Sequence, residues 1–386
     1  MLNGLKAIDW LGSLTIVGGT LMLLLGLEYG GVSYSWGAAI VICLIIFGLF
    51  TGFLFFLNEW KLAKYAIMPP RIFRRRSNLA ALAVCFCHAF VLLPGFFFLP
   101  IYFQAVVSAT PILSGVYLLP FVLSLSFTSV STGIFIKITG HYIEPIRAGL
   151  LLMTLGVGLF IDLPAYASWS RIIIFQIIAG LGTGPNFLAP LIALQTLVAP
   201  GDIAAATATF MFVRQLSTGI SVVIGAVIFQ NQMQKHYGLL LRSGVSPQFV
   251  SLLTGGGATA LTTLVRDLPA PQREAVINAY TESMQKMWIL YVCVGMVGFL
   301  LSLAIQRQEL NKQHEVIKTG LEAQESYRMK AVAAQVQSYQ SDDGQAMRNP
   351  VSQAHDLTRD QDTVHKPQDA GMALHDLRPG DDIQEE

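Results

Sequence analysis

The sequence predicts an all-α polytopic membrane protein with about eight transmembrane helices. Its 386 residues are 53% hydrophobic and only 13% charged, whereas soluble domains carry roughly 25% charged residues. Crossing a hydrocarbon core of ~30 Å requires ~20 apolar residues, and about eight apolar runs approach or reach that length. Basic residues also gather between particular runs, as they do in cytoplasmic loops. The formal net charge of +1 gives no indication of a nucleic-acid partner.

Two apolar runs open the chain, at residues 8–27 and 37–57. We expect each to form a transmembrane helix, because no small-x-small cleavage site follows the first run as it would in a signal peptide. A basic linker at 58–76 comes next and carries Lys61, Lys64, Arg71, Arg74, Arg75 and Arg76 against one acid, Glu59. Short loops rich in Lys and Arg stay in the cytoplasm, so the linker indicates topology, and its cations also suit lipid headgroups.

Six further apolar runs follow within residues 77–306. They span 79–103, 115–136, 148–167, 172–198, 203–229 and 288–305. If the basic linker is cytoplasmic, alternation places the basic loop 137–147 and both termini in the cytoplasm as well. The segment 230–287 then becomes a long outer loop. Within it, three consecutive glycines at 255–257 predict a flexible break, and 271–287 predicts a short amphipathic helix leading into the last span.

The C-terminal region, 307–386, is polar. Residues 307–337 are helix-prone and predict a cytoplasmic extension of the last span. From Ser338 onward Asp, Gln, Ser and Pro are frequent, so the segment has too little apolar surface to offset the entropy of ordering. We therefore expect a disordered tail there, with either a regulatory role or none.

Arg214 is the most informative candidate residue, because it lies ~14 Å into a run that starts near Ala205. A cation in the membrane interior costs ~2.5–3.5 kcal/mol on insertion scales. One interpretation is that Arg214 faces a polar cavity, where it binds an anionic substrate group or takes part in proton coupling. The other is that it snorkels, or pairs with carbonyls of the neighbouring span. Gln215, Asn186 and Gln195 either line the same cavity or pack between helices.

His88 and Asp162 are two further titratable candidates. His88 lies ~15 Å into its run, where it either relays protons or forms a hydrogen-bonded part of the core. Asp162 precedes Leu163-Pro164, which favours an interfacial position over a relay. The chain has no P-loop, Gly-x-Ser-x-Gly elbow or His-Glu-x-x-His motif. The sequence therefore predicts neither an enzyme nor a bound cofactor or metal.

The run at 172–198 is interrupted by residues that disturb helices. It contains Gly180, Gly182, Gly184, Pro185 and Pro190. Glycine and proline inside a span cost free energy unless neighbouring protein or a watery cavity compensates. A simple membrane anchor has no reason to carry them, so we interpret this run as part of a polytopic protein with an internal path.

Four groups of residues, in chain order, carry a resemblance to a known family. They are Leu99–Val106 with Ser114–Pro120, then Gly133–Tyr142, Gly180–Pro190 and Phe212–Leu216. Together they resemble the major facilitator superfamily, and in particular its fourteen-span drug:proton antiporter branch. Gly133, Lys137 and Gly140 match the family's Gly-x-x-x-(basic)-x-x-Gly loop signature.

The resemblance implies proton-coupled efflux of hydrophobic small molecules, such as drugs or toxins, across a lipid bilayer. It implies that 1–57 form two accessory transmembrane helices and that 77–306 form the C-terminal six-helix half of a transporter. The N-terminal half would then be missing, and alternating access needs both halves. The expectations are therefore a transporter or partner half, with a non-transporting membrane scaffold as the alternative. We expect the plasma membrane, with the vacuolar membrane as the other location.

Overall fold

The protein is all-α, as its computed structural model shows. The structure describes residues 9–30, 34–61, 68–254, 265–266, 268–308 and residue 329. Eight helices within this part of the chain are long and apolar enough to cross a membrane, which confirms the predicted fold class. Several predictions fall outside it: Lys64 of the basic linker, the glycine break at 255–257, nearly all of the C-terminal extension, and the disordered tail.

The long helices follow the predicted apolar runs. They are α2 (Trp10–Tyr29), α3 (Ala39–Lys61), α5 (Arg76–Ala105), α7 (Leu119–Thr139), α8 (Ile143–Leu159), α9 (Trp169–Thr183), α11 (Ile203–Lys235) and α15 (Ala270–Ser302). Shorter helices connect them: α4 (Pro70–Phe73), α6 (Pro111–Tyr117), α10 (Ala189–Gln195), α12 (Tyr237–Arg242) and α13 (Pro247–Thr254). Three single 3₁₀ turns complete the set: η1 (Phe160–Asp162), η2 (Gly184–Phe187) and η3 (Pro200–Asp202).

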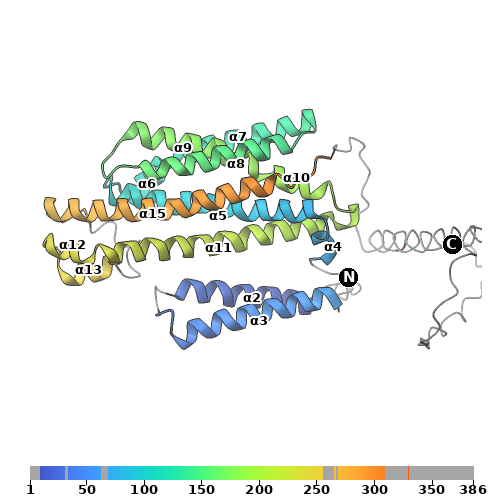
Figure 1. Ribbon diagram of the computed structural model, residues 1–386, viewed down its shortest axis with the longest axis horizontal. Coiled ribbons are helices and arrows are strands. Elements are labelled where there is room, and N and C mark those ends of the chain that lie inside the picture. The colour runs from blue at the N-terminus through green and yellow to red at the C-terminus, as the bar shows by residue number, and fades with distance from the viewer. Residues whose placement is uncertain are drawn as a thin grey trace, which may run out of the picture. The chain divides into compact units, whose positions relative to one another are not determined.

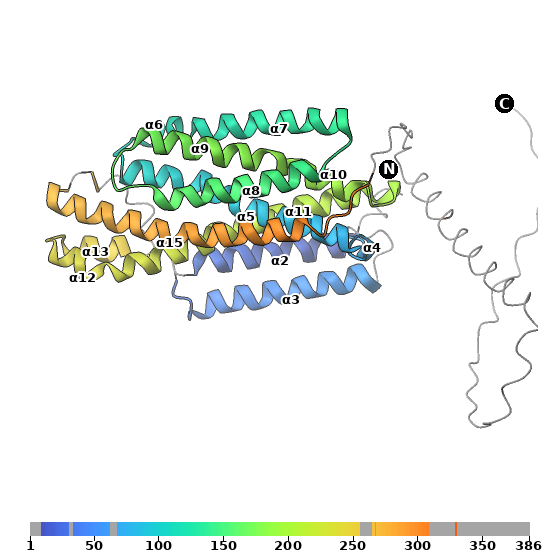
Figure 2. The ribbon, with the colours of Figure 1, turned by 45° about the horizontal axis from the view of Figure 1, so that its top comes forward.

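Helix α5 is the central element of the six-helix unit. It packs against α11 and α15 along its length, and the layer of α7, α8 and α9 lies on the other side (Figures 1 and 2). In its apolar stretch 72% of the residues are buried, compared with 17% in α7. The other helices therefore present apolar faces outward, as helices surrounded by lipid do.

A proline in α5 shapes the contact between α5 and α11. Pro94 has no backbone N–H, so the Phe90 carbonyl four residues earlier loses its helical partner. Ser221 of α11 donates its hydroxyl hydrogen to this carbonyl. One turn away, Ser217 donates to the Phe86 carbonyl at 2.6 Å. Side-chain hydroxyls thus satisfy backbone groups where water is absent.

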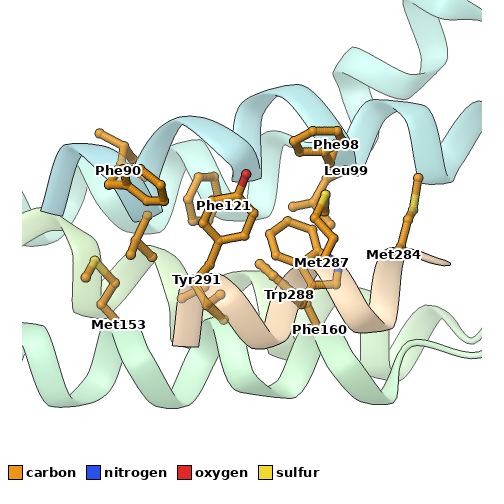
Figure 3. Packing of buried hydrophobic residues seen from close by; sticks show 14 of the residues in the cluster. Phe90, Phe98, Leu99, Phe121, Met153, Phe160, Met284, Met287, Trp288 and Tyr291 are labelled. Carbon is orange, nitrogen blue, oxygen red and sulfur yellow. The ribbon is translucent and has the colours of Figure 1, made fainter. Parts of the chain in front are cut away.

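Aromatic side chains fill the space between α5, α8 and α15 (Figure 3). The Trp288 ring lies 5.1 Å from Phe160 and 5.8 Å from Tyr291, and Tyr291 lies 5.8 Å from Phe90. These tilted contacts are the geometry that aromatic pairs prefer. The Tyr291 hydroxyl also donates to the Ser221 carbonyl at 3.0 Å, so α15 is fixed to α11 as well.

Helices α2 and α3 form a closely packed pair. Gly19 and Gly48 face each other, and a Cβ atom on Gly48 would lie 2.8 Å from the backbone nitrogen of Leu23. Small residues allow such close approach in membrane helices. Asp9 caps α2 by accepting from the Gly12 amide at 2.8 Å, and Asn58 of α3 donates to the same carboxylate at 2.7 Å.

The segment expected to be a long outer loop is helical at both ends. Helix α11 continues to Lys235, and α15 begins at Ala270 and runs without interruption into the last span. The expected short helix at 271–287 is therefore the first half of α15. Its buried face at Val276 and Tyr280 continues directly into the membrane part, and no helix breaker separates them.

Candidate functional site

The interrupted span is divided into three pieces in the structure. Helix α9 ends at Thr183, η2 takes the next four residues, and α10 begins at Ala189. Pro185 and Pro190 each stand in the first turn of their element, where a missing N–H is tolerated. The backbone of η2 therefore leaves the regular α-helical pattern at mid-span, and its carbonyls become available to other groups.

Glycines allow η2 and the end of α9 to lie against two neighbouring helices. A Cβ atom on Gly182 would collide with the backbone of α8 at Leu152 and Met153. A Cβ on Gly180 or Gly184 would meet the backbone of α7 instead. Close backbone approach thus requires glycine at these positions and fixes the break between α7 and α8.

Arg214 of α11 binds the break directly. Its Nη2 donates to the Phe187 carbonyl at 2.9 Å. The guanidinium carbon lies 4.4 Å from the centroid of the Phe187 ring and 5.3 Å from that of Phe210. Arg214 is half-buried, so it remains partly accessible from outside the unit. One of the two interpretations of Arg214 was that it pairs with a carbonyl of the neighbouring span, and the structure contains this contact.

His88 of α5 reaches the same break from the other side. Its Nε2 lies 3.0 Å from the Thr183 carbonyl, and its ring packs edge-on against Phe187 with centroids 6.1 Å apart. A carbonyl only accepts hydrogen bonds, so Nε2 carries the hydrogen and Nδ1 is the acceptor in the neutral ring. This Nδ1 is buried without a hydrogen-bond partner among the described residues.

Cys85 completes what we call the Arg214 cluster. It lies one turn before His88 on α5, donates weakly to the Phe210 carbonyl at 3.7 Å, and interacts with the Arg214 side chain. The Arg214 cluster consists of Cys85, His88, Thr183, Phe187, Phe210 and Arg214. Three segments that are distant in the sequence thus meet at one place: α5, the junction of α9 with η2, and α11.

The predicted amide residues lie between helices. Asn186 is fully buried next to Gly149 of α8, and neither of its amide atoms has a hydrogen-bond partner among the described residues. Gln195 donates to the Thr207 hydroxyl at 2.9 Å and so joins α10 to α11. Gln215, which follows Arg214, is exposed on the outside of α11.

Asp162 lies apart from the Arg214 cluster. It is exposed in η1 at the end of α8, and its carboxylate pairs with Arg171 at 3.1 Å. This surface ion pair fits the interfacial position that was expected from the sequence.

The predicted loop signature forms a second polar site at the ends of α7 and α8. Gly140 has φ +74° and ends α7, a conformation that favours glycine. Gly133 borders open space and Lys137 is exposed. Tyr142 follows, and its hydroxyl donates to the Gln306 carbonyl and accepts from the Gln308 amide, both at 2.9 Å. We call this contact the Tyr142 clamp.

Sequence reasoning missed the aromatic part of the Arg214 cluster. Phe210 precedes Arg214 by four residues on one helix, and residues four apart are neighbours on a helix surface. That spacing was a usable signal. Phe187 and Thr183 had no such signal, because their contacts join helices that are far apart in the chain.

Comparison with known proteins shows that the chain is similar to membrane transporters of fungi. It is 48% identical over 324 residues to the efflux pump dotC of Dothistroma septosporum, covering 84% of this chain and 55% of the relative. It is 45% identical over 326 residues to the MFS-type transporter ppz2 of Metarhizium majus, covering 84% and 56% respectively. An MFS-type transporter of Aspergillus terreus is 42% identical over 334 residues, covering 85% and 60%. No protein-family model matches the chain.

The chain belongs to the major facilitator superfamily. As a major facilitator protein it is a multi-pass membrane protein, in agreement with its eight apolar helices. The chain spans about half the length of the curated relatives it matches. The Arg214 cluster lies inside the six-helix unit of this major facilitator chain, at the break between α9 and α10.

Proposed function

We propose that this chain is part of a transporter that exports hydrophobic small molecules across a lipid bilayer. The Arg214 cluster is the observation that carries the proposal. It holds a cation and a broken helix at mid-span, and both are disfavoured in lipid unless they serve a polar path. The relatives named as efflux pumps support the same function.

Export also requires a second half under this proposal. Rocking of one half against the other gives alternating access in transporters of this type. We assign residues 1–57 to two accessory helices, 58–76 to a cytoplasmic linker and 77–306 to one six-helix half, with both termini in the cytoplasm. The partner is then an N-terminal half, and the membrane is the plasma membrane or, alternatively, the vacuolar membrane.

Export of a fluorescent amphiphile from cells tests this function. The full chain is expressed alone and together with the N-terminal half of a relative such as dotC. We expect export in the paired cells, and an Arg214→Ala variant should lower its rate about tenfold or more, because one lost charged contact is worth ~1.5–3 kcal/mol. Arg242→Gln is the matched control, since Arg242 is exposed at the end of α12. No export in either cell type would reject the proposal.

Proton coupling is the finer part of the proposal, and His88 is its candidate carrier. The Nδ1 atom of His88 has no partner among the described residues, so it is the ring nitrogen that would take up a proton when the site opens to water. We expect a protonophore to stop export, and His88→Gln to lower export while leaving substrate binding in place. Export that continues after the proton gradient is dissipated would exclude this coupling.

A membrane scaffold is the second candidate function, because the contacts of Arg214 with the Phe187 carbonyl and two aromatic rings also suit a purely structural role. Cross-linking in cells distinguishes the two functions. A scaffold would capture a partner protein and still show no export when an N-terminal half is supplied.

A further inference from the structure

Arg214 has no carboxylate partner among the residues that the structure describes. The ion pairs there join Arg71 to Asp202, Arg171 to Asp162, His236 to Glu282 and Arg307 to Glu144. The described acidic residues also lie near helix ends or in the part of α15 that precedes Trp288. The positive charge of Arg214 is therefore not neutralised within this part of the molecule.

The contacts that Arg214 does make compensate its charge only in part. One carbonyl dipole, two aromatic faces and the thiol of Cys85 contact the Arg214 side chain, but none of them carries a negative charge. The Nε atom is buried without a hydrogen-bond partner in the described chain. Because a cation in a water-poor site is disfavoured unless it is paired, Arg214 is built to receive an anion.

The surroundings of Arg214 define what kind of anion fits. The rings of Phe187 and Phe210 flank the guanidinium, and the ring of His88 packs against Phe187. Phe210 and His88 are fully buried, whereas Phe187 is half-buried and is the ring on which a flat, apolar ligand body can lie. The planar guanidinium suits an oxyanion with two oxygens, such as a carboxylate or sulfonate.

We propose that Arg214 binds the acidic group of an aromatic organic acid, carried as its anion, while the ligand's ring lies against Phe187. This inference rests on the proposed export function and names its substrate class. Arg214 as a whole is half-buried, so part of the residue remains accessible to such a ligand. Arginine keeps its charge at any physiological pH, so Arg214 acts as a fixed anion receptor and not as the proton carrier.

Binding of two matched probes to the purified full chain tests the inference. The anionic probe is anilinonaphthalenesulfonate and the neutral one is N-phenylnaphthylamine, which shares the aromatic body but lacks the sulfonate. Fluorescence titration in nanodiscs, with protein-free nanodiscs subtracted, gives both affinities. We expect Arg214→Gln to weaken the anionic probe about tenfold or more and the neutral probe less than about twofold.

Two further variants separate charge from fold. Arg214→Lys keeps the charge but loses the planar fork, so we expect an intermediate loss for the anionic probe. Arg242→Gln removes an exposed cation of equal charge and should change neither affinity. Size-exclusion elution and thermal melting establish that each variant is folded.

Three outcomes would overturn the inference. Equal weakening of both probes in Arg214→Gln would assign Arg214 a purely structural role. No weakening of either would remove Arg214 from the site. A wild-type chain without preference for the anionic probe would show that Arg214 does not select an anionic ligand. Binding is measured without transport, so loss of export with intact anion selectivity would contradict the proposed function alone.

Discussion

At the scale of single residues, hydroxyl groups replace the hydrogen bonds that prolines remove. Ser221 donates to the Phe90 carbonyl, which Pro94 leaves without its helical partner. In a membrane, no water is present to take over this role. Arg214 also donates to a backbone carbonyl, that of Phe187 in η2, which is available because the helix breaks there.

Replacing Ser221 by alanine should lower the stability of the unit by about 1–2 kcal/mol, because the Phe90 carbonyl is left unsatisfied. The measurement is thermal unfolding in detergent. Restoring the backbone N–H with Pro94→Ala should make the same serine replacement nearly neutral. Ser131→Ala is the control, since this hydroxyl is exposed and bonds only within its own helix. Equal effects of Ser221→Ala in both backgrounds would contradict the account.

The Tyr142 clamp gives a second residue-level prediction. Tyr142→Phe removes the hydroxyl that contacts both Gln306 and Gln308, so we expect a loss of about 1–2 kcal/mol. Tyr166→Phe is the control, because Tyr166 is 63% exposed. Hydrogen exchange at residues 303–308 should rise in the first variant alone, and an unchanged exchange rate there would show that the clamp does not hold this segment.

At the scale of elements, apolarity predicted where helices cross the membrane but not where they end. The run at 288–305 corresponds to the apolar part of α15, whereas the helix itself starts at Ala270. Polar residues such as Glu274 and Glu282 continue a helix readily when water surrounds them. Hydropathy alone therefore underestimates the length of such helices.

Hydropathy also made part of the Arg214 cluster predictable from the sequence. Arg214 and His88 stand out in the sequence because a charge or a titratable ring is costly within an apolar run. Their meeting at Phe187 depends on how α5, η2 and α11 pack, and contacts between helices so distant in the chain leave no local pattern. Gln215 shows the limit clearly, since it follows Arg214 and yet is exposed outside.

Two glycines provide a matched test of the packing of η2. Gly182→Ala places a methyl group against the α8 backbone, so we expect a loss of ~1–3 kcal/mol or failure to fold. Gly133→Ala borders open space within α7 and should be neutral or stabilising by up to ~1 kcal/mol. Melting temperatures in detergent measure both. The account of close packing fails if the two variants behave alike.

At the scale of the whole molecule, we propose a membrane orientation from the basic linker and the alternation of helices. Arg75 lies in the linker, and Arg242 lies at the far end of α11 in the connecting helix α12. If the linker is cytoplasmic, the two positions face opposite compartments.

Cysteine labelling tests this orientation directly. A membrane-impermeant maleimide should label Arg242→Cys in intact cells and Arg75→Cys only after permeabilisation, in a background with the four native cysteines replaced. Labelling of both positions in intact cells would rule out the proposed topology.

Helix α11 has 33 residues, so at 1.5 Å per residue it is ~50 Å long, well beyond a hydrocarbon core of ~30 Å. Arg214 lies nearer its N-terminal end. Helices α12 and α13 follow its other end (Figure 1). A tilt of about 10° around one end of such a helix sweeps the opposite tip through roughly 9 Å. Under the proposed function, ligand binding that tilted α11 would displace the α12 end of the helix farther than Arg214 itself.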